Sequence, residues 1–181
     1  MTKRLRDIAT PDQQVETPDG APVGTTIAGS QIHKPVIHVD HRGALFEVYD
    51  GDPQRWPDPI VWIYHTSLFP GVIKGWFVHD VKVDRYTLAQ GELLCLLYDD
   101  RPDSTTRGVS QAVMLSERGN RQITIPAGVW HLIVNVGPSE TTVINCPTTP
   151  YHHENPDRRA LPWDTDEIPV DVRKYLPAAW S

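Results

Sequence analysis

The chain is poor in the residues and runs that mark several classes of protein. It has two cysteines, Cys95 and Cys146, each inside an apolar run and neither in a CxxC spacing. This excludes a disulfide framework or a cysteine-based zinc site, and we expect two buried thiols in a reducing compartment. No apolar run approaches the length of a membrane span, and the first residues lack the apolar stretch of a secretory signal. We therefore expect a cytoplasmic protein with no membrane partner.

Excess positive charge and helical periodicity are also missing. The net charge of −6 argues against a broad nucleic-acid-binding face, although a local cluster of Arg or Lys remains able to hold one phosphate. No stretch of useful length follows the helical period before the C-terminus. The 181 residues, 39% apolar and 22% charged, are enough for one globular domain with a real core.

What the chain does have is a series of short strand-like runs separated by Gly, Pro, Asn and Asp turns. Runs 85–89 and 92–98 flank Gln90-Gly91, which predicts a tight hairpin between them. The series as a whole predicts an antiparallel sandwich or barrel. The expected strands are 36–39, 44–49, 60–64, 72–78, 85–89, 92–98, 112–115, 122–125, 129–136 and 141–145.

The two ends of the chain have a different composition from the middle. Residues 9–30 are rich in Pro, Gly, Thr, Asp and Gln, which suits an extended arm, and residues 147–170 hold many prolines and acidic residues, which suits a wrapping loop. Near the end, residues 171–175 are long enough for one helical turn. We therefore expect a flexible or partner-binding arm over 1–30, a barrel over 31–146 and a segment over 147–181 that closes the barrel.

Four blocks between about residues 35 and 170 carry more specific information. They are residues 40–47, residues 71–79 with Asp84 and 90–92, residues 125–131, and residues 145–164 with Tyr151. In order and spacing these blocks resemble the dTDP-4-dehydrorhamnose 3,5-epimerase family of cupins. The resemblance implies an all-β jelly-roll barrel, a nucleotide-linked 4-keto-6-deoxy sugar as the small-molecule substrate, no cofactor and a homodimer.

The same resemblance implies proton transfer next to the sugar ketone. In the family, a His held by an Asp removes the proton, a cation steadies the enolate and a Tyr returns a proton. Lys74 stands where the family has an Arg on this strand, and Tyr151 lies in the region of the acid Tyr. Arg42 matches the family's pyrophosphate-binding Arg, often supplied across a dimer interface, and Glu47 ends the same block.

Two positions depart from the family pattern. Phe77 stands where the family has its His base, and a phenyl ring cannot take a proton. The position of the Asp partner aligns best with Thr165, although a shift of one residue restores Asp164 or Asp166. Loss of both groups together indicates a changed reaction or no reaction, and we keep Asp164 as a substrate-binding candidate.

Strand geometry indicates what replaces the base. Residues two apart on a strand share a face, so His79 points the same way as Phe77, with Asp84 nearby. His79 is then a displaced base, or else a rim histidine bonded to solvent or backbone. Lys74 has the opposite parity unless a bulge intervenes. The catalytic candidates are His79, Lys74, Tyr151 and Asp84, and the substrate-binding candidates are Arg42, Glu47, Phe77, His131 and Asp164.

Other readings remain open. We expect no metal, because Phe77 removes the first His of a His-x-His pair, although His79, His131 and either His65 or Glu92 remain able to gather round an ion. The alternatives to an epimerase are an enzyme of another class, such as a lyase, cyclase or dehydratase of natural-product biosynthesis, and a non-catalytic ligand-binding barrel.

Overall fold

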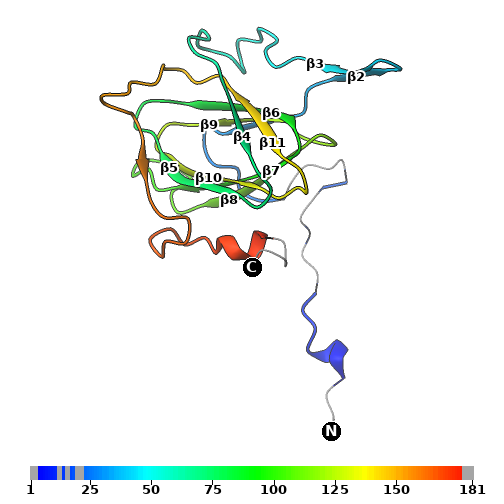
Figure 1. The fold of residues 1–181 in the computed structure, drawn as a ribbon. Coiled ribbons are helices and arrows are strands. Elements are labelled where there is room, and N and C mark those ends of the chain that lie inside the picture. The colour runs from blue at the N-terminus through cyan, green and yellow to red at the C-terminus, as the bar shows by residue number, and fades with distance from the viewer. Residues whose placement is uncertain (1–3, 12–13, 15–16, 19–22, 177–181) are drawn as a thin grey trace.

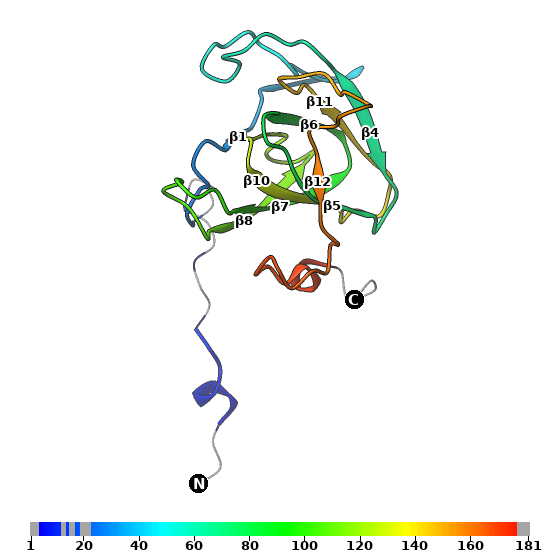
Figure 2. The ribbon, with the colours of Figure 1, turned by 90° about the vertical axis from the view of Figure 1, so that its left-hand side faces the viewer.

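Two antiparallel sheets of five strands face each other in the computed structural model of this chain, which describes residues 4–11, 14, 17–18 and 23–176 (Figures 1 and 2). The expected all-β barrel is confirmed. The first sheet has the order β1 (Gln31–His33), β9 (Gln122–Ile125), β6 (Asp84–Gln90), β11 (Thr141–Asn145) and β4 (Tyr64–Leu68). The second has the order β12 (Arg159–Ala160), β5 (Ile73–Val78), β10 (Val129–Asn135), β7 (Glu92–Asp99) and β8 (Ser110–Ser116).

Apolar side chains fill both the space between the sheets and one outer face. The inward residues of β6, β7 and β9 form the central core, which includes Leu88, Leu93 and Ile123. A second cluster around Trp76 lies where the C-terminal segment, with the short helix η2 (Val172–Tyr175), packs on the outer face of the second sheet. The strands β7 and β10 are nearly continuous apolar runs rather than alternating ones, so both faces of this sheet have apolar side chains to cover.

Some expectations for the strands were wrong. Run 60–64 does not form a strand, since β4 begins only at Tyr64. The Gln90-Gly91 turn does not join a hairpin, because β6 and β7 belong to different sheets and the turn carries the chain between them. At Gly91, a Cβ would lie 2.9 Å from the Thr141 Cα, so the turn runs tightly against β11. Neither β1 nor β12 was predicted.

A bulge in β5 changes which side chains face the interior. Phe77 pairs with His131 of β10, but Lys74 pairs with Ile133, so β5 has one residue more than its partner between these pairs. The extra residue lies next to Gly75, whose φ is +127° and where a Cβ would lie 2.7 Å from the His131 carbonyl oxygen and the Leu132 Cα. Only glycine fits this close approach.

The N-terminal segment is partly integrated into the barrel. Ile27 is fully buried in the central core, and its N–H donates to Gln111 Oε1, so the packed body begins before the expected boundary at residue 31. The helix η1 (Leu5–Asp7) lies well away from the body (Figure 1). Among the described residues, no helix is long and apolar enough to cross a membrane.

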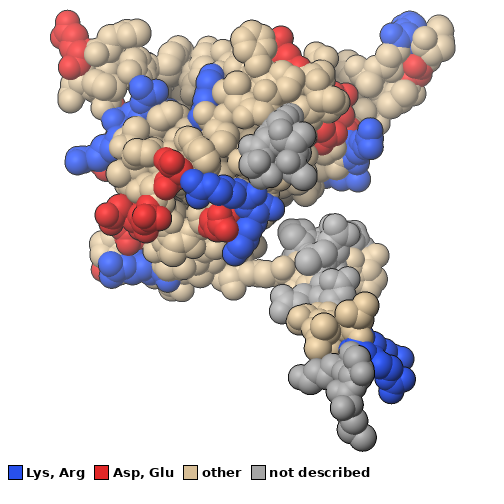
Figure 3. Space-filling model, turned by 60° about the horizontal axis from the view of Figure 1, so that its bottom comes forward, with Lys and Arg blue, Asp and Glu red and all other residues tan. Residues whose placement is uncertain are grey.

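One hairpin projects from the body. The strands β2 (Ile37–Asp40) and β3 (Gly43–Phe46) pair only with each other and extend outward (Figure 1). On the face shown in Figure 3, cationic and acidic side chains are interspersed rather than gathered into a patch of one sign.

Candidate functional site

A cavity of about 240 Å³ opens between the two sheets. Its walls come from β4, β5, β6 and β10 and from the segment after β11, so residues far apart in the sequence meet there. Of the predicted site residues, the structure brings Lys74, Phe77, His79, His131 and Tyr151 into this lining. The complete lining is Trp62, Tyr64, Thr66, Lys74, Phe77, His79, Lys82, Tyr86, His131, Ile133, Tyr151 and Arg158.

The floor of the cavity is organised around the Asp84 carboxylate, which is 1% exposed. The His79 Nε2 lies 3.2 Å and the His131 Nε2 lies 3.4 Å from Asp84 Oδ2. On the other oxygen, Oδ1, the Lys82 ammonium lies at 3.1 Å and Asn145 Nδ2 donates a hydrogen bond of 2.7 Å. Strand alternation produces this arrangement, since Asp84 begins β6 with its side chain inward.

Charge and burial set the protonation of the floor. Burial alone raises the pKa of the Asp84 carboxyl, but the His79 hydrogen bond and the attraction of His131 and Lys82 outweigh it and hold the pKa well below its usual range. Burial lowers the pKa of His131 to about 4, against the opposing attraction of Asp84. At neutral pH the floor therefore holds a carboxylate beside a neutral His131 ring.

The two histidines are oriented by backbone carbonyls. His79 Nδ1 faces the carbonyl oxygen of Asp157, and His131 Nδ1 lies 3.2 Å from the carbonyl oxygen of Val129. Each ring therefore has one nitrogen against a carbonyl and the other against Asp84. Because both nitrogens of His79 face oxygen atoms of the protein, this ring is poorly placed to take a proton from a ligand.

Residues 157–160 hold the loop of residues 79–83, which follows β5 and carries His79, in place. The Asp157 carboxylate accepts hydrogen bonds from the backbone N–H groups of Asp80, Val81 and Lys82 at 2.7 to 3.0 Å. The next residue, Arg158, lies with its guanidinium 4.9 Å from the centre of the Phe77 ring. This segment therefore forms part of the cavity wall.

The bulge in β5 places Lys74 in the same cavity as Phe77. Without a bulge, the alternation of side chains along the strand would put the two residues on opposite faces. The Lys74 ammonium donates to Thr66 Oγ1 at 3.1 Å and to the Ser67 carbonyl oxygen at 3.4 Å. These bonds hold a positive charge at the mouth of the cavity. Together with Arg158 and Lys82, Lys74 makes the lining suited to an anionic ligand.

Aromatic side chains, two of them with hydroxyl groups, form another wall of the cavity. The Trp62 ring lies 4.8 Å from the Tyr64 ring and stacks on Tyr151 at 6.3 Å between centroids. Asn145 donates to the Tyr64 oxygen, while burial, followed by the Asp84 charge, raises the pKa of Tyr64 to about 12, so its own proton stays available to a ligand. Within the described part of the chain, the Tyr151 hydroxyl has no hydrogen-bond partner.

Three predicted binding residues lie outside the cavity. Arg42 sits at the tip of the β2–β3 hairpin, paired with Asp40, and its side chain is 78% exposed. Glu47 is exposed just after β3. Asp164 is exposed and lines a shallow hollow of the C-terminal segment, as does Thr165. Within one protomer, none of the three reaches the cavity.

Sequence reasoning missed several lining residues. Lys82 and Tyr86 lie two residues on either side of Asp84, so strand alternation was a usable signal for both. Tyr64 and Arg158 gave no comparable signal, because a misplaced strand hid the first and only the pairing of β12 with β5 brings in the second.

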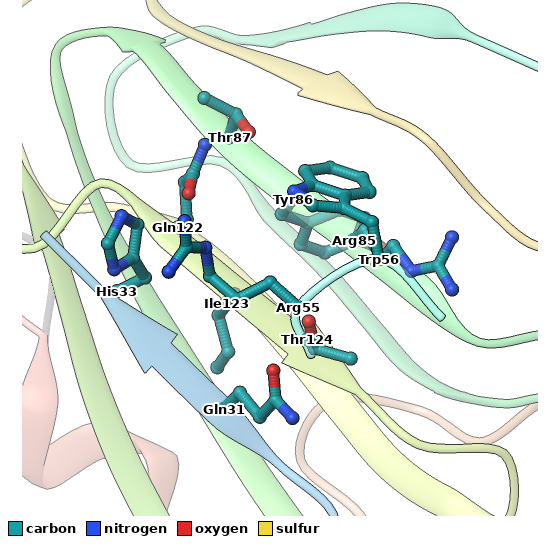
Figure 4. Close-up of a pocket in the computed structure, with 10 residues that line it drawn as sticks. All are labelled: Gln31, His33, Arg55, Trp56, Arg85, Tyr86, Thr87, Gln122, Ile123 and Thr124. Atoms are coloured by element: carbon teal, nitrogen blue, oxygen red, sulfur yellow. The ribbon is translucent and has the colours of Figure 1, made fainter. Parts of the chain in front are cut away.

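A second pocket lies on the outer face of the first sheet. Figure 4 shows residues of β1, β6 and β9 facing Arg55 and Trp56, which come from the loop after β3. Its free space is about 20 Å³, enough for little more than a water molecule. Arg85, which is buried there, is paired with Asp58 at 2.8 Å. The larger cavity is therefore the candidate site.

Comparison with known proteins identifies a consistent set of relatives. The family model described as dTDP-4-dehydrorhamnose 3,5-epimerase matches residues 24–179. A probable low-salt glycan biosynthesis epimerase of Haloferax volcanii is 32% identical over 75% of this chain and 87% of its own length. The spore coat polysaccharide biosynthesis protein SpsL of Bacillus subtilis is 30% identical over 78% and 93%, respectively.

Solved structures share the fold. A dTDP sugar isomerase from Desulfovibrio desulfuricans has a TM-score of 0.74 at 23% identity, covering 80% of this chain and 91% of that chain. A double mutant of the 3'-monoepimerase ChmJ from Streptomyces bikiniensis, in complex with dTDP, has a TM-score of 0.73 at 18% identity, covering 85% and 79%. At these identities the likeness concerns the fold alone.

Proposed function

Since this chain belongs to the dTDP-4-dehydrorhamnose 3,5-epimerase family, we propose that it exchanges a proton next to the ketone of a nucleotide-linked 4-keto-6-deoxy sugar, with an altered catalytic base. The observation that carries the proposal is the cavity itself. It combines proton-transfer groups with three cationic side chains, Lys74, Lys82 and Arg158, at the place where the family's base is replaced by Phe77.

We assign the proton transfer to Tyr151. The Tyr151 oxygen gives its own proton to water in the open cavity and takes the proton from the carbon beside the ketone, while the C–H electron pair moves to the carbonyl oxygen as an enolate. A water molecule on the other face then protonates the same carbon, the carbonyl re-forms, and the carbon is inverted. Tyr151 is favoured over His79, because its hydroxyl has no partner among the described residues while both His79 nitrogens face protein oxygens.

Positive charge and a hydroxyl donor stabilise the enolate in this scheme. The Tyr64 hydroxyl keeps its proton, since its pKa is raised to about 12, and it is able to donate to the enolate oxygen. The Lys74 ammonium at the cavity mouth adds a fixed charge. Arg158, over the Phe77 ring, is placed to contact a phosphate group of the nucleotide.

The test is deuterium uptake from heavy water into a dTDP-linked 4-keto-6-deoxy sugar, followed by proton NMR. Loss of a general acid–base group lowers such a rate by about 10² to 10⁴, so Tyr151→Phe should reduce uptake by at least the lower figure, and Tyr175→Phe, an exposed tyrosine, should not. If deuterium uptake is lost in His79→Gln but kept in Tyr151→Phe, the base is His79 and not Tyr151. No uptake with any 4-keto-6-deoxy sugar nucleotide favours the dehydratase or binding-barrel alternatives.

We further propose that the protein is a homodimer in which the β2–β3 hairpin contacts a second copy. An isolated two-stranded hairpin is only marginally stable, and this one exposes Val36, Val39 and Leu45 to 73, 74 and 61%. Its tip carries Arg42, which then reaches the partner's cavity. Sedimentation should give the dimer mass, and Val39→Lys should shift it toward the monomer without unfolding the barrel.

A cytoplasmic location is part of the same proposal. Both cysteines, Cys95 and Cys146, are free and buried, which a reducing compartment favours. Cell fractionation tests this directly, and recovery of the protein from an oxidising compartment would contradict it.

A further inference from the structure

Three metal-binding groups converge at the floor of the cavity, and the proposed epimerase reaction does not require them to do so. His79 and His131 each offer one ring nitrogen and Asp84 one carboxylate oxygen, and these three atoms all lie within 4.8 Å of one another. All three residues are buried. We propose that His79, Asp84 and His131 bind one divalent transition-metal ion, of the class of Zn²⁺, Co²⁺ or Fe²⁺.

The spacing of the donor atoms fits such an ion. The two imidazole nitrogens lie 3.2 and 3.4 Å from Asp84 Oδ2. Ligands about 2.0 to 2.1 Å from a tetrahedral ion lie about 3.3 Å apart, so both nitrogen–oxygen separations match. The separation of the two ring nitrogens, at most 4.8 Å, closes to this value by rotation of the rings. A set of two imidazoles and one carboxylate suits zinc or ferrous iron rather than Mg²⁺ or Ca²⁺.

The polar groups of the floor are incompletely satisfied without a cation. In the described part of the chain, His131 Nε2 is buried and has no hydrogen-bond partner, and it faces Asp84 Oδ2. When its Nδ1 donates to the Val129 carbonyl, the lone pair of Nε2 points at a carboxylate. Two acceptors face to face are unfavourable in a buried site. An ion between them removes this conflict.

The surrounding contacts are those that orient metal ligands. His79 and His131 each direct Nδ1 at a backbone carbonyl, and a ring that donates its Nδ1–H there offers Nε2 as a metal ligand. For His79 the ion then replaces the hydrogen bond between Nε2 and Asp84. Asn145 and Lys82 hold Asp84 through Oδ1, while Oδ2 faces both imidazoles and accepts only a long bond of 3.4 Å from the Tyr86 hydroxyl. His79 and His131 also line the cavity, so the remaining coordination positions face the space where a ligand would lie.

Lys82 opposes binding and provides a diagnostic. Its ammonium lies 3.1 Å from Asp84 Oδ1 and repels a second cation nearby. Replacing it with Met removes that charge while keeping most of the side chain. Lys82→Met should therefore tighten metal binding by about tenfold, since one nearby charge in a protein is worth at least about 1.4 kcal/mol.

The experiment is calorimetric titration of the chelator-stripped full chain with ZnCl₂ and CoCl₂, with MgCl₂ in parallel. Wild type should bind one Zn²⁺ per chain with micromolar or tighter affinity, and Co²⁺ should give visible d–d absorption. Asp84→Asn and His131→Gln should each weaken Zn²⁺ binding by about 100-fold or more. His65→Gln, an exposed histidine of β4, is the matched control and should bind as wild type does.

The readout does not depend on turnover, so it separates this inference from the proposed function. No Zn²⁺ or Co²⁺ bound at 100-fold excess over protein would overturn the metal site, whatever the deuterium result. Equal affinities in Asp84→Asn and wild type would place the ion on surface histidines and overturn it too. If Asp84→Asn fails to fold, the Lys82→Met affinity and the Co²⁺ spectrum of His131→Gln decide the matter.

Discussion

Two buried carboxylates, Asp99 and Asp84, differ in a way that separates architecture from chemistry. Asp99, at the end of β7, is fully buried and accepts hydrogen bonds from Arg101, Ser104 Oγ and Thr106 Oγ1. Arg101 also donates to the carbonyl oxygen of Ala28, so this carboxylate ties the N-terminal segment to the barrel. Every partner of Asp99 is a donor that keeps its proton near neutral pH.

Asp84 has partners of another kind. It is surrounded by two imidazoles, an ammonium and an amide beside an open cavity. The Arg101 hydrogen bond, ahead of the opposing effect of burial, lowers the pKa of Asp99, and the pKa of Asp84 is lowered as well. A buried carboxylate with a depressed pKa does not by itself mark a functional site. Partners that can exchange protons or bind a metal distinguish Asp84.

Removing the charge of Asp99 should have the largest effect on stability. Asp99→Asn removes the charge that pairs with Arg101 and turns one of the two acceptor oxygens into an NH₂ donor among Arg101, Ser104 and Thr106. Breaking such a buried pair costs about 3 kcal/mol. Urea denaturation measures the change in the free energy of unfolding. Asp100→Asn, next to it and exposed, should change it by less than about 0.5 kcal/mol. A loss under about 1 kcal/mol in Asp99→Asn would remove the architectural half of the comparison.

As the pH falls, the groups around Asp84 should reduce the stability of the fold before those around Asp99 do. The pKa of His131 is lowered from 6.5 to about 4, so the unfolded chain binds a proton that the folded chain refuses, and stability falls as the pH drops through this window. The free energy of unfolding falls by on the order of 3 kcal/mol as the pH drops to 4. Well above pH 6.5 this loss is absent. The depressed pKa of Asp99 acts only below about pH 4.

Denaturation in chelator between pH 7 and 4 tests this order. His131→Gln should flatten the pH dependence in this window, and His65→Gln should leave it as in wild type. A wild-type stability that stays constant down to pH 4 would contradict the neutral, buried state of His131.

Asp84→Asn should lower the free energy of unfolding by about 1 kcal/mol, which is less than the loss expected for Asp99→Asn. The cavity gives Lys82 and His79 access to water once their partner is neutral, which limits the penalty. Deuterium uptake into the sugar nucleotide should nonetheless fall by about 10², because Asp84 orients His79, His131 and Lys82 of the cavity lining and misplacing such groups costs about that factor. Thermal melts and NMR exchange on the same sample measure both quantities. Equal losses of stability in the two variants would make Asp84 as structural as Asp99.

The smallest effect on stability is expected at the mouth of the cavity. Lys74 is exposed and bonded to Thr66 and Ser67 at the surface, so Lys74→Met should leave the free energy of unfolding within about 0.5 kcal/mol of wild type. Deuterium uptake into the sugar nucleotide should fall by about tenfold, because a fixed positive charge that stabilises the enolate is lost. Lys34→Met, an exposed lysine outside the cavity, serves as the control in the NMR exchange measurement.

The sequence was a good guide wherever a strand alternates regularly. It placed His79 on the side of Phe77 and put Asp84 nearby, and the structure has His79 Nε2 3.2 Å from Asp84 Oδ2. It misjudged the Gln90-Gly91 turn, since a glycine turn between two strands is compatible with a hairpin and with a crossing between sheets. Which of the two occurs depends on pairings with β9, β10 and β11, which no local pattern contains.

Other features of the site lay beyond local patterns for a similar reason. The bulge that places Lys74 in the cavity depends on the close approach of Gly75 to the His131 carbonyl. Arg158 reaches Phe77 only through the pairing of β12 with β5. Whether Arg42 and Asp164 serve a ligand stays a prediction, and for Arg42 it depends on a second copy of the chain.

Residues 157–160 hold the loop after β5, and this determines which segments have to move together if the cavity is transferred to a relative. The Asp157 carbonyl faces His79, its carboxylate caps residues 80–82, and Arg158 covers Phe77, so late residues of the chain finish a site begun some eighty residues earlier. A chimera that transplanted only β5 and the loop after it into a relative would carry His79 without the contacts that orient its ring. Exchange of activities between members of this family therefore has to move both segments as a single module.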